Sequence, residues 1–347
     1  MREGQGSLLE SPTEALVNTV NTVGVMGKGI ALQFKRAYPD MFKAYTAACK
    51  RGEVELGRMH VWSTGSLTGP RYIINFPTKR HWKARSRLSD IAAGLGDLTR
   101  VLIDHGIKSV AVPPLGCGNG GLNWADVRPM IQEAFSRLPD VDVLVFPPAG
   151  APAAIEMRTA TERPRLTLGK AALVTLISEY GDRAFEVSLV EVQKLMYFLQ
   201  TAGEPLRLQY AKGPYGPYAD NLRHSLISSE GHYLTGFGDG SKEVPVTEPL
   251  RPLPGAREAA IRVIEDHPVT AERIERVLQL TDGFETAYSM ELLATVHWIA
   301  TQDAPRHASD AETLGELVRQ WSPRKRGLFG QRHVTIVWQH LHDEKWI

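Results

Sequence analysis

The sequence has little of what metal centres, disulfide frameworks and membrane spans require. Among its 347 residues, Cys49 and Cys117 are the only cysteines, and they form neither a zinc-binding spacing nor a disulfide framework. The eleven histidines show no metal-ligand spacing either, so we expect no metal and no bound cofactor. No apolar run reaches the length of a membrane span, and the N-terminus MREGQGSLLESP lacks the basic-then-apolar pattern of a signal peptide. These absences favour a cytoplasmic protein with no membrane partner.

An excess of charge of one sign is also missing, because the formal net charge is only +1. The charges are nevertheless unevenly distributed. Residues 1–150 hold 18 Lys and Arg against 13 Asp and Glu, whereas residues 151–347 hold 22 against 26. A basic half beside an acidic half suggests that the two halves have different partners.

Residues 1–150 alternate between strand-like and helix-like segments. Continuous Val, Ile and Leu runs alternating with helices are typical of a sheet that is covered on both faces. The first half is therefore predicted to be an α/β domain. Strands are predicted at 15–20, 58–63, 71–76, 109–114 and 141–148, and helices at 27–38, 41–52, 89–105 and 124–138.

The second half has a different organisation. Residues 151–166 are rich in Pro, Ala and charge and are predicted to be a linker, followed by a mainly α-helical domain over 167–347. The segment LRLQYAKGPYGPY (206–218) is predicted to be a strand followed by turns, and the order helix, helix, strand, turn resembles a winged-helix arrangement. Helices are predicted at 168–180, 188–201, 219–229, 256–266, 270–281, 286–301, 311–321 and 331–343.

Two glycine-rich loops follow buried strands and precede helices. They are NTVNTVGVMGKGIAL (18–32) and PPLGCGNGGLNW (113–124). Glycine lets a backbone approach a ligand closely, and free backbone N–H groups at such turns can bind a diphosphate. Each loop alone is equally consistent with a tight strand-to-helix turn. Neither carries a Walker lysine or a Rossmann fingerprint, which argues against an ordinary NTPase or dehydrogenase.

Four features occur together in one order: Asn18 and Asn21, the MGKGIA turn, the strand YIINFPTK and the loop PPLGCGNGGL. In this order they resemble a macrodomain, a fold that binds ADP-ribose. The runs VNTVNTVGVMGKGIALQFK and INFPTKRHW resemble DarG-type DNA ADP-ribosyl glycohydrolases, the macrodomain antitoxins of DarT/DarG toxin–antitoxin systems. The resemblance covers residues 6–150 and continues, less specifically, through KGPYGPYADNLRHSL, ELLATVHWIA and WSPRKR. It implies a mixed sheet between helices, followed by a helical domain that binds the toxin.

The resemblance also assigns site residues. It implies that Lys79 and Asn21 are catalytic and that Asn21 contacts the distal ribose. Two positions depart from related macrodomains: Ser7 stands where many have an acid that contacts adenine, and Gly120 stands where other lysine-using members have Asp. Another group or a water must therefore handle the proton. The implied ADP-ribose-binding residues are Asn21, Gly27, Lys28, Gly29, Ile30, Thr78, Pro114, Leu115, Gly116, Cys117, Gly118, Asn119, Gly120 and Gly121.

The chemistry of an amine fits the role implied for Lys79. A neutral amine can attack the anomeric carbon of the distal ribose, or its ring-opened aldehyde, and release the base. A lysine ordinarily titrates near pKa ~10.4, so this role needs a lowered pKa. We expect burial and the neighbouring Arg80 to lower it. The alternative is that Lys79 pairs with a ligand phosphate or faces solvent.

The segment KRHWKARSR (79–87) combines five Lys or Arg residues with one His and one Trp. Cations interleaved with aromatics suit single-stranded nucleic acid, through phosphate contacts and base stacking. A solvated loop is the alternative. If the segment binds DNA, the contacting residues are predicted to be Arg80, His81, Trp82, Lys83 and Arg85.

The second half is predicted to bind a partner through Tyr215 and Tyr218, which proline-glycine turns present, although such tyrosines can equally hold their own loop. Residues 239–291 hold eleven acids against six basic residues, and an acidic surface would fit the basic cleft of a DNA-modifying toxin. The basic patch WSPRKRG (321–327) leaves operator DNA as an alternative partner.

Taken with the resemblance, the sequence predicts an antitoxin that removes ADP-ribose from thymidine in single-stranded DNA and binds a DarT-like toxin. ADP-ribose would be ligand and product, with no cofactor. Two alternatives remain open: a reader that binds ADP-ribose without cleavage, and a hydrolase acting on ADP-ribosylated protein or a small ADP-ribose metabolite.

Overall fold

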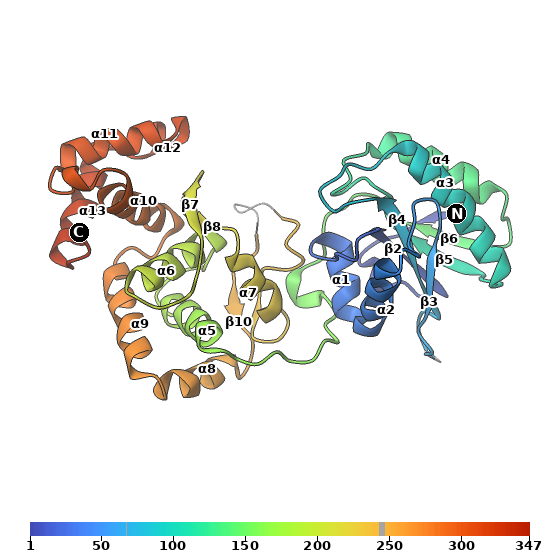
Figure 1. The fold of residues 1–347 in the computed structure, drawn as a ribbon, viewed down its shortest axis with the longest axis horizontal. Helices are drawn as coiled ribbons and strands as arrows, with labels where there is room; N and C mark the ends of the chain where they lie inside the picture. The colour runs from blue at the N-terminus through green and yellow to red at the C-terminus, as the bar shows by residue number, and fades with distance from the viewer. Residues whose placement is uncertain (67, 243–246) are drawn as a thin grey trace. The chain divides into compact units, whose positions relative to one another are not determined.

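The computed structural model describes residues 1–66, 68–242 and 247–347. The chain divides into two compact units, each with its own core (Figure 1). Unit 1 comprises Met1–Glu162 together with Asp239–Ser241, and unit 2 comprises Arg163–Gly238 and Lys242–Ile347. Glu243, one of the eleven acids counted above, lies outside the described residues.

Unit 1 is built on a six-stranded sheet with the strand order β1-β6-β5-β2-β4-β3. Strand β3 runs antiparallel to its neighbour, and the other pairs are parallel. The predicted mixed sheet is confirmed, and the N-terminal strand β1 was not predicted. The strands are β1 (Arg2–Glu3), β2 (Ala15–Asn21), β3 (His60–Ser63), β4 (Tyr72–Lys79), β5 (Ser109–Val112) and β6 (Asp142–Val145).

Helices cover both faces of this sheet, because its central strands alternate apolar side chains between two cores. Ala15 and Val17 of β2 pack toward α3 (Leu88–Asp104) and α4 (Trp124–Ser136). Leu16 and Val20 pack toward α1 (Gly29–Ala37) and α2 (Pro39–Lys50) on the other face (Figure 1). The result is the three-layer arrangement that places both glycine-rich loops at the carboxyl ends of parallel strands.

The end of β4 differs from the prediction in a way that matters for the site. The strand was predicted to end at Phe76, but it continues to Lys79. It tolerates Pro77 because β3 pairs with β4 only as far as Asn75. The register with β2 slips after Val20, so that Asn21 pairs with Lys79 and Thr78 is an extra residue. Such a bulge redirects the side chain that follows it.

Unit 2 is largely helical, as predicted, and its core is formed by α5, α6, α9 and α10, among others. A capping box formed by Ser188 and Glu191 begins α6. The helices are α5 (Leu168–Gly181), α6 (Leu189–Thr201), α7 (Leu222–Ser229), α8 (Ala256–Glu265), α9 (Pro268–Thr281), α10 (Ala287–Trp298), α11 (Ala311–Trp321), α12 (Pro323–Leu328) and α13 (Gln331–Asp343). None of the described helices is both long and apolar enough to cross a bilayer.

Short strands complete unit 2. The segment 206–218, predicted to be a strand and turns, forms all but the last residue of the antiparallel hairpin of β7 (Tyr210–Gly213) and β8 (Gly216–Ala219). A second pair joins β9 (Leu234–Thr235) to β10 (Arg251–Pro252). The winged-helix-like part stays a prediction. Helix α12 was not predicted, because its sequence was read as a basic patch.

Candidate functional site

Lys79 lies at the carboxyl end of β4, between the two glycine-rich loops. Its Nζ donates a hydrogen bond of 2.9 Å to the backbone oxygen of Asn119 in the second loop. Burial lowers the pKa of Lys79 below its ordinary value, as the proposed chemistry requires. Repulsion from Arg80, predicted as a second cause, is not among the causes of this shift, and the Arg80 side chain is exposed.

Asn21 is buried and its amide organises the first loop. Its Oδ1 accepts hydrogen bonds from the backbone N–H groups of Val23 and Val25, and its Nδ2 donates to the Val25 backbone oxygen at 2.6 Å. The hydroxyl of Tyr45 on α2 donates to the Asn21 backbone oxygen. Asn21 therefore fixes the shape of the loop beside Lys79, a role that the sequence did not reveal.

The second loop folds tightly around its glycines. The N–H of Leu122 donates to Gly116 O and the N–H of Ser86 donates to Gly120 O, both at 3.0 Å. A Cβ added to Gly120 would lie 2.3 Å from Ser86 Oγ and 2.4 Å from Gly116 O. The loop therefore requires glycine at position 120 for packing. Gly116 has a φ of +72°, which also favours glycine.

The two loops approach one another closely. A Cβ at Gly29, where α1 begins, would lie 3.2 Å from the side-chain nitrogen of Asn119. The N–H of Gly29 donates to the backbone oxygen of Asp239, which belongs to unit 1, and Gln33 donates to the Asp239 carboxylate. The backbone N–H of Gly29 therefore already has a hydrogen-bond acceptor within the protein. The other backbone N–H groups that were predicted to bind the ligand belong to the two glycine-rich loops.

The segment that follows Lys79, Arg80–Arg87, is called the connector here. Its Arg80 O accepts from both the N–H and the hydroxyl of Thr22, at 3.2 and 2.8 Å, which joins it to the first loop. Ser86 joins it to the second loop, as described above. Trp82 is exposed, and the Lys83 ammonium lies 4.8 Å from the centre of its ring. Cations and an exposed aromatic thus surround the end of β4.

Cys117 lies in the second loop with its thiol half-buried. Burial, with a smaller effect of Asp126, raises the pKa of this thiol to about 11. A thiol with so high a pKa holds almost no thiolate at neutral pH, so it is poorly suited to act as a nucleophile.

In unit 2, side chains from other elements hold the β7–β8 hairpin through hydrogen bonds to its backbone. Lys194 Nζ donates to Pro217 O at 2.6 Å, and Trp321 Nε1 donates to Gly213 O at 3.0 Å. Gln193 exchanges two hydrogen bonds with the backbone of Ala219. The partly buried Tyr215 therefore lies in a fixed turn, and the partly buried Tyr218 lies in strand β8 beside it.

A buried ionic network lies beneath this hairpin. The Glu291 carboxylate of α10 accepts from Arg324 at 2.6 and 3.0 Å and also from Lys325, whose side chain is fully buried. Arg324 also lies over the ring of Tyr215, 4.6 Å from its centre. Burial lowers the pKa of Lys194 to about 7, with Lys325 as the second cause. Two of the basic residues of WSPRKRG are thus engaged internally, which weakens the operator alternative.

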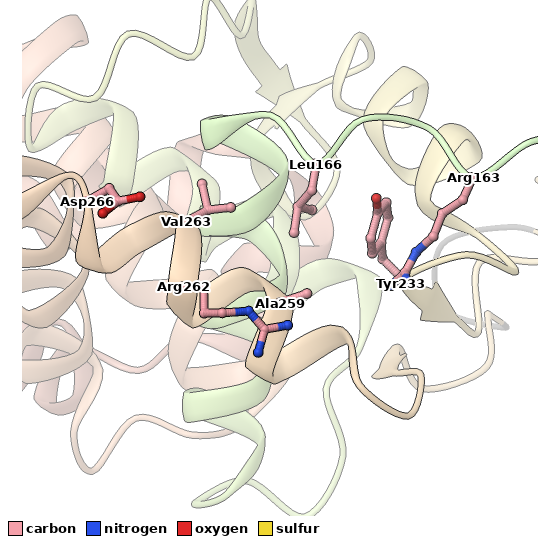
Figure 2. A pocket seen from close by; sticks show the side chains of 7 residues that line it. All are labelled: Arg163, Leu166, Tyr233, Ala259, Arg262, Val263 and Asp266. Atoms are coloured by element: carbon pink, nitrogen blue, oxygen red, sulfur yellow. The ribbon is translucent and has the colours of Figure 1, made fainter.

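Unit 2 also contains a shallow pocket of about 380 Å³ that the sequence did not predict. Figure 2 shows Arg163 beside the Tyr233 ring at one end of the pocket and Asp266 at the other, with Leu166 and Val263 between them. The guanidinium of Arg163 lies 4.4 Å from the centre of the Tyr233 ring. None of its lining residues was a predicted site residue.

Comparisons with known proteins agree with this architecture. The Macro domain family matches residues 17–131. A DNA ADP-ribosyl glycohydrolase of Mycobacterium tuberculosis is 46% identical over 350 residues, which cover 96% of this chain and 97% of that protein.

Two further relatives carry related names. A DNA ADP-ribosyl glycohydrolase of Thermus aquaticus is 45% identical over 337 residues, covering 97% of this chain and 91% of the relative. A DNA ADP-ribosyl transferase–DNA ADP-ribosyl glycohydrolase fusion protein of Thermosipho africanus is 36% identical over 159 residues, covering 42% of this chain and 41% of the relative.

Proposed function

The chain belongs to the DNA ADP-ribosyl glycohydrolases, hydrolases that contain a macrodomain, and on this premise we propose that it removes ADP-ribose from thymidine in single-stranded DNA. One observation carries the proposal. The Lys79 amine, its pKa lowered by burial, ends a strand between two glycine-rich loops and contacts the second of them. A reactive amine would thus stand where the distal ribose of a bound ADP-ribose would lie.

The reaction would proceed in two displacements at the anomeric carbon. The lone pair of the neutral Lys79 amine forms a bond to this carbon, and the electrons of the glycosidic bond leave with the base, which takes up a proton. Water then adds to the same carbon, and the lysine departs with its electron pair, releasing ADP-ribose. The ammonium form has no lone pair, so the lowered pKa increases the reactive fraction.

The surrounding residues would bind the rest of the substrate. The backbone of Gly116–Gly121 would hold the diphosphate, and Gly27–Ile30 would line the other side. Gly120 stands where other lysine-using members have Asp, and we propose that a water carries the proton. The connector would hold the DNA strand, with Arg80 and Lys83 near phosphates and Trp82 against a base.

The test follows the mass of an oligonucleotide that carries one ADP-ribosylated thymidine. The full-length protein should remove one ADP-ribose, and Lys79→Ala should not. Lys108→Ala is the control: it changes an exposed lysine that follows α3 in the sequence, and this variant should cleave like the unchanged protein. Binding of ADP-ribose without cleavage by the unchanged protein would make it a reader. Equal cleavage by Lys79→Ala would assign the catalysis to another group.

We also infer that unit 2 binds and neutralises a DarT-type ADP-ribosyltransferase toxin through the β7–β8 hairpin. The fusion relative from Thermosipho africanus, which joins transferase and glycohydrolase in one name, supports such a functional pair. The fixed presentation of Tyr215 suits an interface residue, because little conformational entropy remains to be lost on binding.

Calorimetric titration of the toxin into the full-length chain tests this second proposal. Tyr215→Ala should weaken the complex by at least 10-fold if the tyrosine is a central contact. Ile336→Ala, at an exposed apolar residue of α13, serves as the control and should bind normally. Unchanged affinity in Tyr215→Ala would place the interface elsewhere.

A further inference from the structure

Apolar side chains border Lys79 where a strand end usually presents polar ones. The described part of unit 1 exposes seven large apolar side chains, and three of them belong to the segments on either side of Lys79. They are Val23, 47% exposed, Val25, 40% exposed, and Trp82, 48% exposed. Single exposed apolar residues are common, but three around one reactive amine indicate a contact surface.

The two valines are fixed in place. Their backbone N–H groups both bind the buried Asn21 amide, which also donates to Val25 O. The Val25 Cγ1 atom lies 3.8 Å from the position that a Cβ of Gly27 would occupy, over the first glycine turn. The loop thus presents both side chains outward from a rigid backbone instead of leaving them on a mobile one.

Pairing between strands places these valines beside the reaction centre. Asn21 pairs with Lys79 in the sheet, and the next residue, Thr22, makes two hydrogen bonds to Arg80 O. The first loop and the connector therefore begin side by side at Lys79. Val23 and Val25 lie on one of these segments and Trp82 on the other.

The position of the substrate base follows from the bond that is cleaved. The base is attached to the anomeric carbon that Lys79 would attack, so it lies within one bond of the reaction centre and must rest on the adjoining surface. Thymine is the DNA base that carries a methyl group, and apolar side chains are its usual contacts. Resting on the proposed function, we infer that Val23 and Val25 form the surface that receives the modified thymine and recognises its methyl group.

The experiment compares two oligonucleotides that differ by that methyl group. One carries ADP-ribosylated thymidine and the other ADP-ribosylated deoxyuridine at the same position. A methyl group in an apolar pocket changes kcat/KM by roughly 10–200-fold, so a half-open surface should favour thymidine by about 5- to 10-fold. The double variant Val23→Thr, Val25→Thr keeps the side-chain shapes but replaces one methyl group with a hydroxyl at each position, and it should abolish this preference.

Two further measurements make the result specific. The affinity of the double variant for free ADP-ribose, from calorimetry, and its Tm should match those of the unchanged protein. Ile103→Thr alters an exposed apolar residue at the end of α3 and should retain the full preference for thymidine.

Equal cleavage of both oligonucleotides by the unchanged protein would overturn the inference while leaving the glycohydrolase proposal intact. A loss of free ADP-ribose affinity in the double variant would also overturn it, because the valines would then line the ADP-ribose pocket itself. Failure of the unchanged protein to cleave either oligonucleotide would remove the proposed function and the inference together.

Discussion

Replacing Gly120 by alanine tests the packing of the second glycine loop. The new Cβ would lie 2.4 Å from the backbone oxygen of Gly116, whereas real Cβ atoms essentially never come within 3.0 Å of another heavy atom. Rotation can move the Ser86 hydroxyl away, but the carbonyl belongs to the backbone. The loop must therefore open by at least 0.6 Å, the difference between these two distances.

The energetic consequence can be worked out from the contacts that hold the loop. An opening of this size would stretch the 3.0 Å bonds from Leu122 N to Gly116 O and from Ser86 N to Gly120 O beyond hydrogen-bonding distance. Overpacking of this kind costs about 1–3 kcal/mol. For a unit of this size, a loss of about 2 kcal/mol corresponds to a fall in Tm of roughly 4–8 °C.

Scanning calorimetry of the full-length chain without ligand measures this fall, and Gly118→Ala is the matched control. Nothing lies within 4 Å of a Cβ at Gly118, so its Tm should stay within about 1 °C of the unchanged protein. Titration with ADP-ribose then reports on function, and we expect Gly120→Ala to lose at least 10-fold in affinity. A normal Tm and normal affinity in Gly120→Ala would refute the packing argument, as would an equal fall in Tm for both variants.

Three other predictions address the chemistry, the DNA contact and unit 2. The kcat/KM for the ADP-ribosylated oligonucleotide should rise with pH as the Lys79 ammonium loses its proton, and it should level off below the ordinary lysine pKa of 10.5; a flat profile between neutral pH and pH ~10 would contradict this. Trp82→Ala should weaken binding of an unmodified single strand by about 1–3 kcal/mol in fluorescence anisotropy, and unchanged binding would leave the ring without a stacking role. Glu291→Gln should destabilise the chain by about 3–5 kcal/mol in scanning calorimetry, because the fully buried Lys325 loses its countercharge. Asp40→Asn, which breaks an exposed pair, should leave the stability almost unchanged, and equal losses in the two variants would contradict the importance of the buried pair.

Local patterns predicted the fold of unit 1 well, because its strands and helices follow from apolar periodicity. The end of β4 is the informative exception. The strand predicted from the apolar run covered residues 71–76, although a proline is unusual in the central strand that continues past it. The strand continues because β3 ends its pairing at Asn75, and the pairing partner of a residue cannot be read from its own segment.

Unit 2 shows the same limit for charged residues. Arg324 and Lys325 were read as part of an exposed basic patch, yet both bind Glu291, more than 30 residues earlier in the chain. Helix α12 was missed for the same reason, because its one buried residue, Lys325, binds that distant carboxylate. Charge composition describes a segment, whereas ion pairing depends on the fold.

The candidate site divides in a similar way. The glycine loops could be picked out because glycine clusters after strands leave a local signal, whereas the role of Lys79 was implied by the family resemblance. Ser86, Tyr45 and the two exposed valines were missed, since each acts through neighbours that only the folded sheet brings together. Ser86 lies within the basic run of the connector, and nothing in that local sequence indicates its hydrogen bond to Gly120.

The support of the β7–β8 hairpin has a consequence for how such chains diverge. Lys194 and Trp321 bind carbonyl oxygens of the hairpin, which every residue type supplies, instead of its side chains. Substitutions at Pro214 and Tyr215 would therefore leave these hydrogen bonds in place. On the proposal that this hairpin binds the toxin, a lineage facing a changing toxin can alter the turn residues one at a time, while the supporting lysine and tryptophan stay constant. Exchanging turn sequences between relatives would then test whether the turn sets the choice of partner.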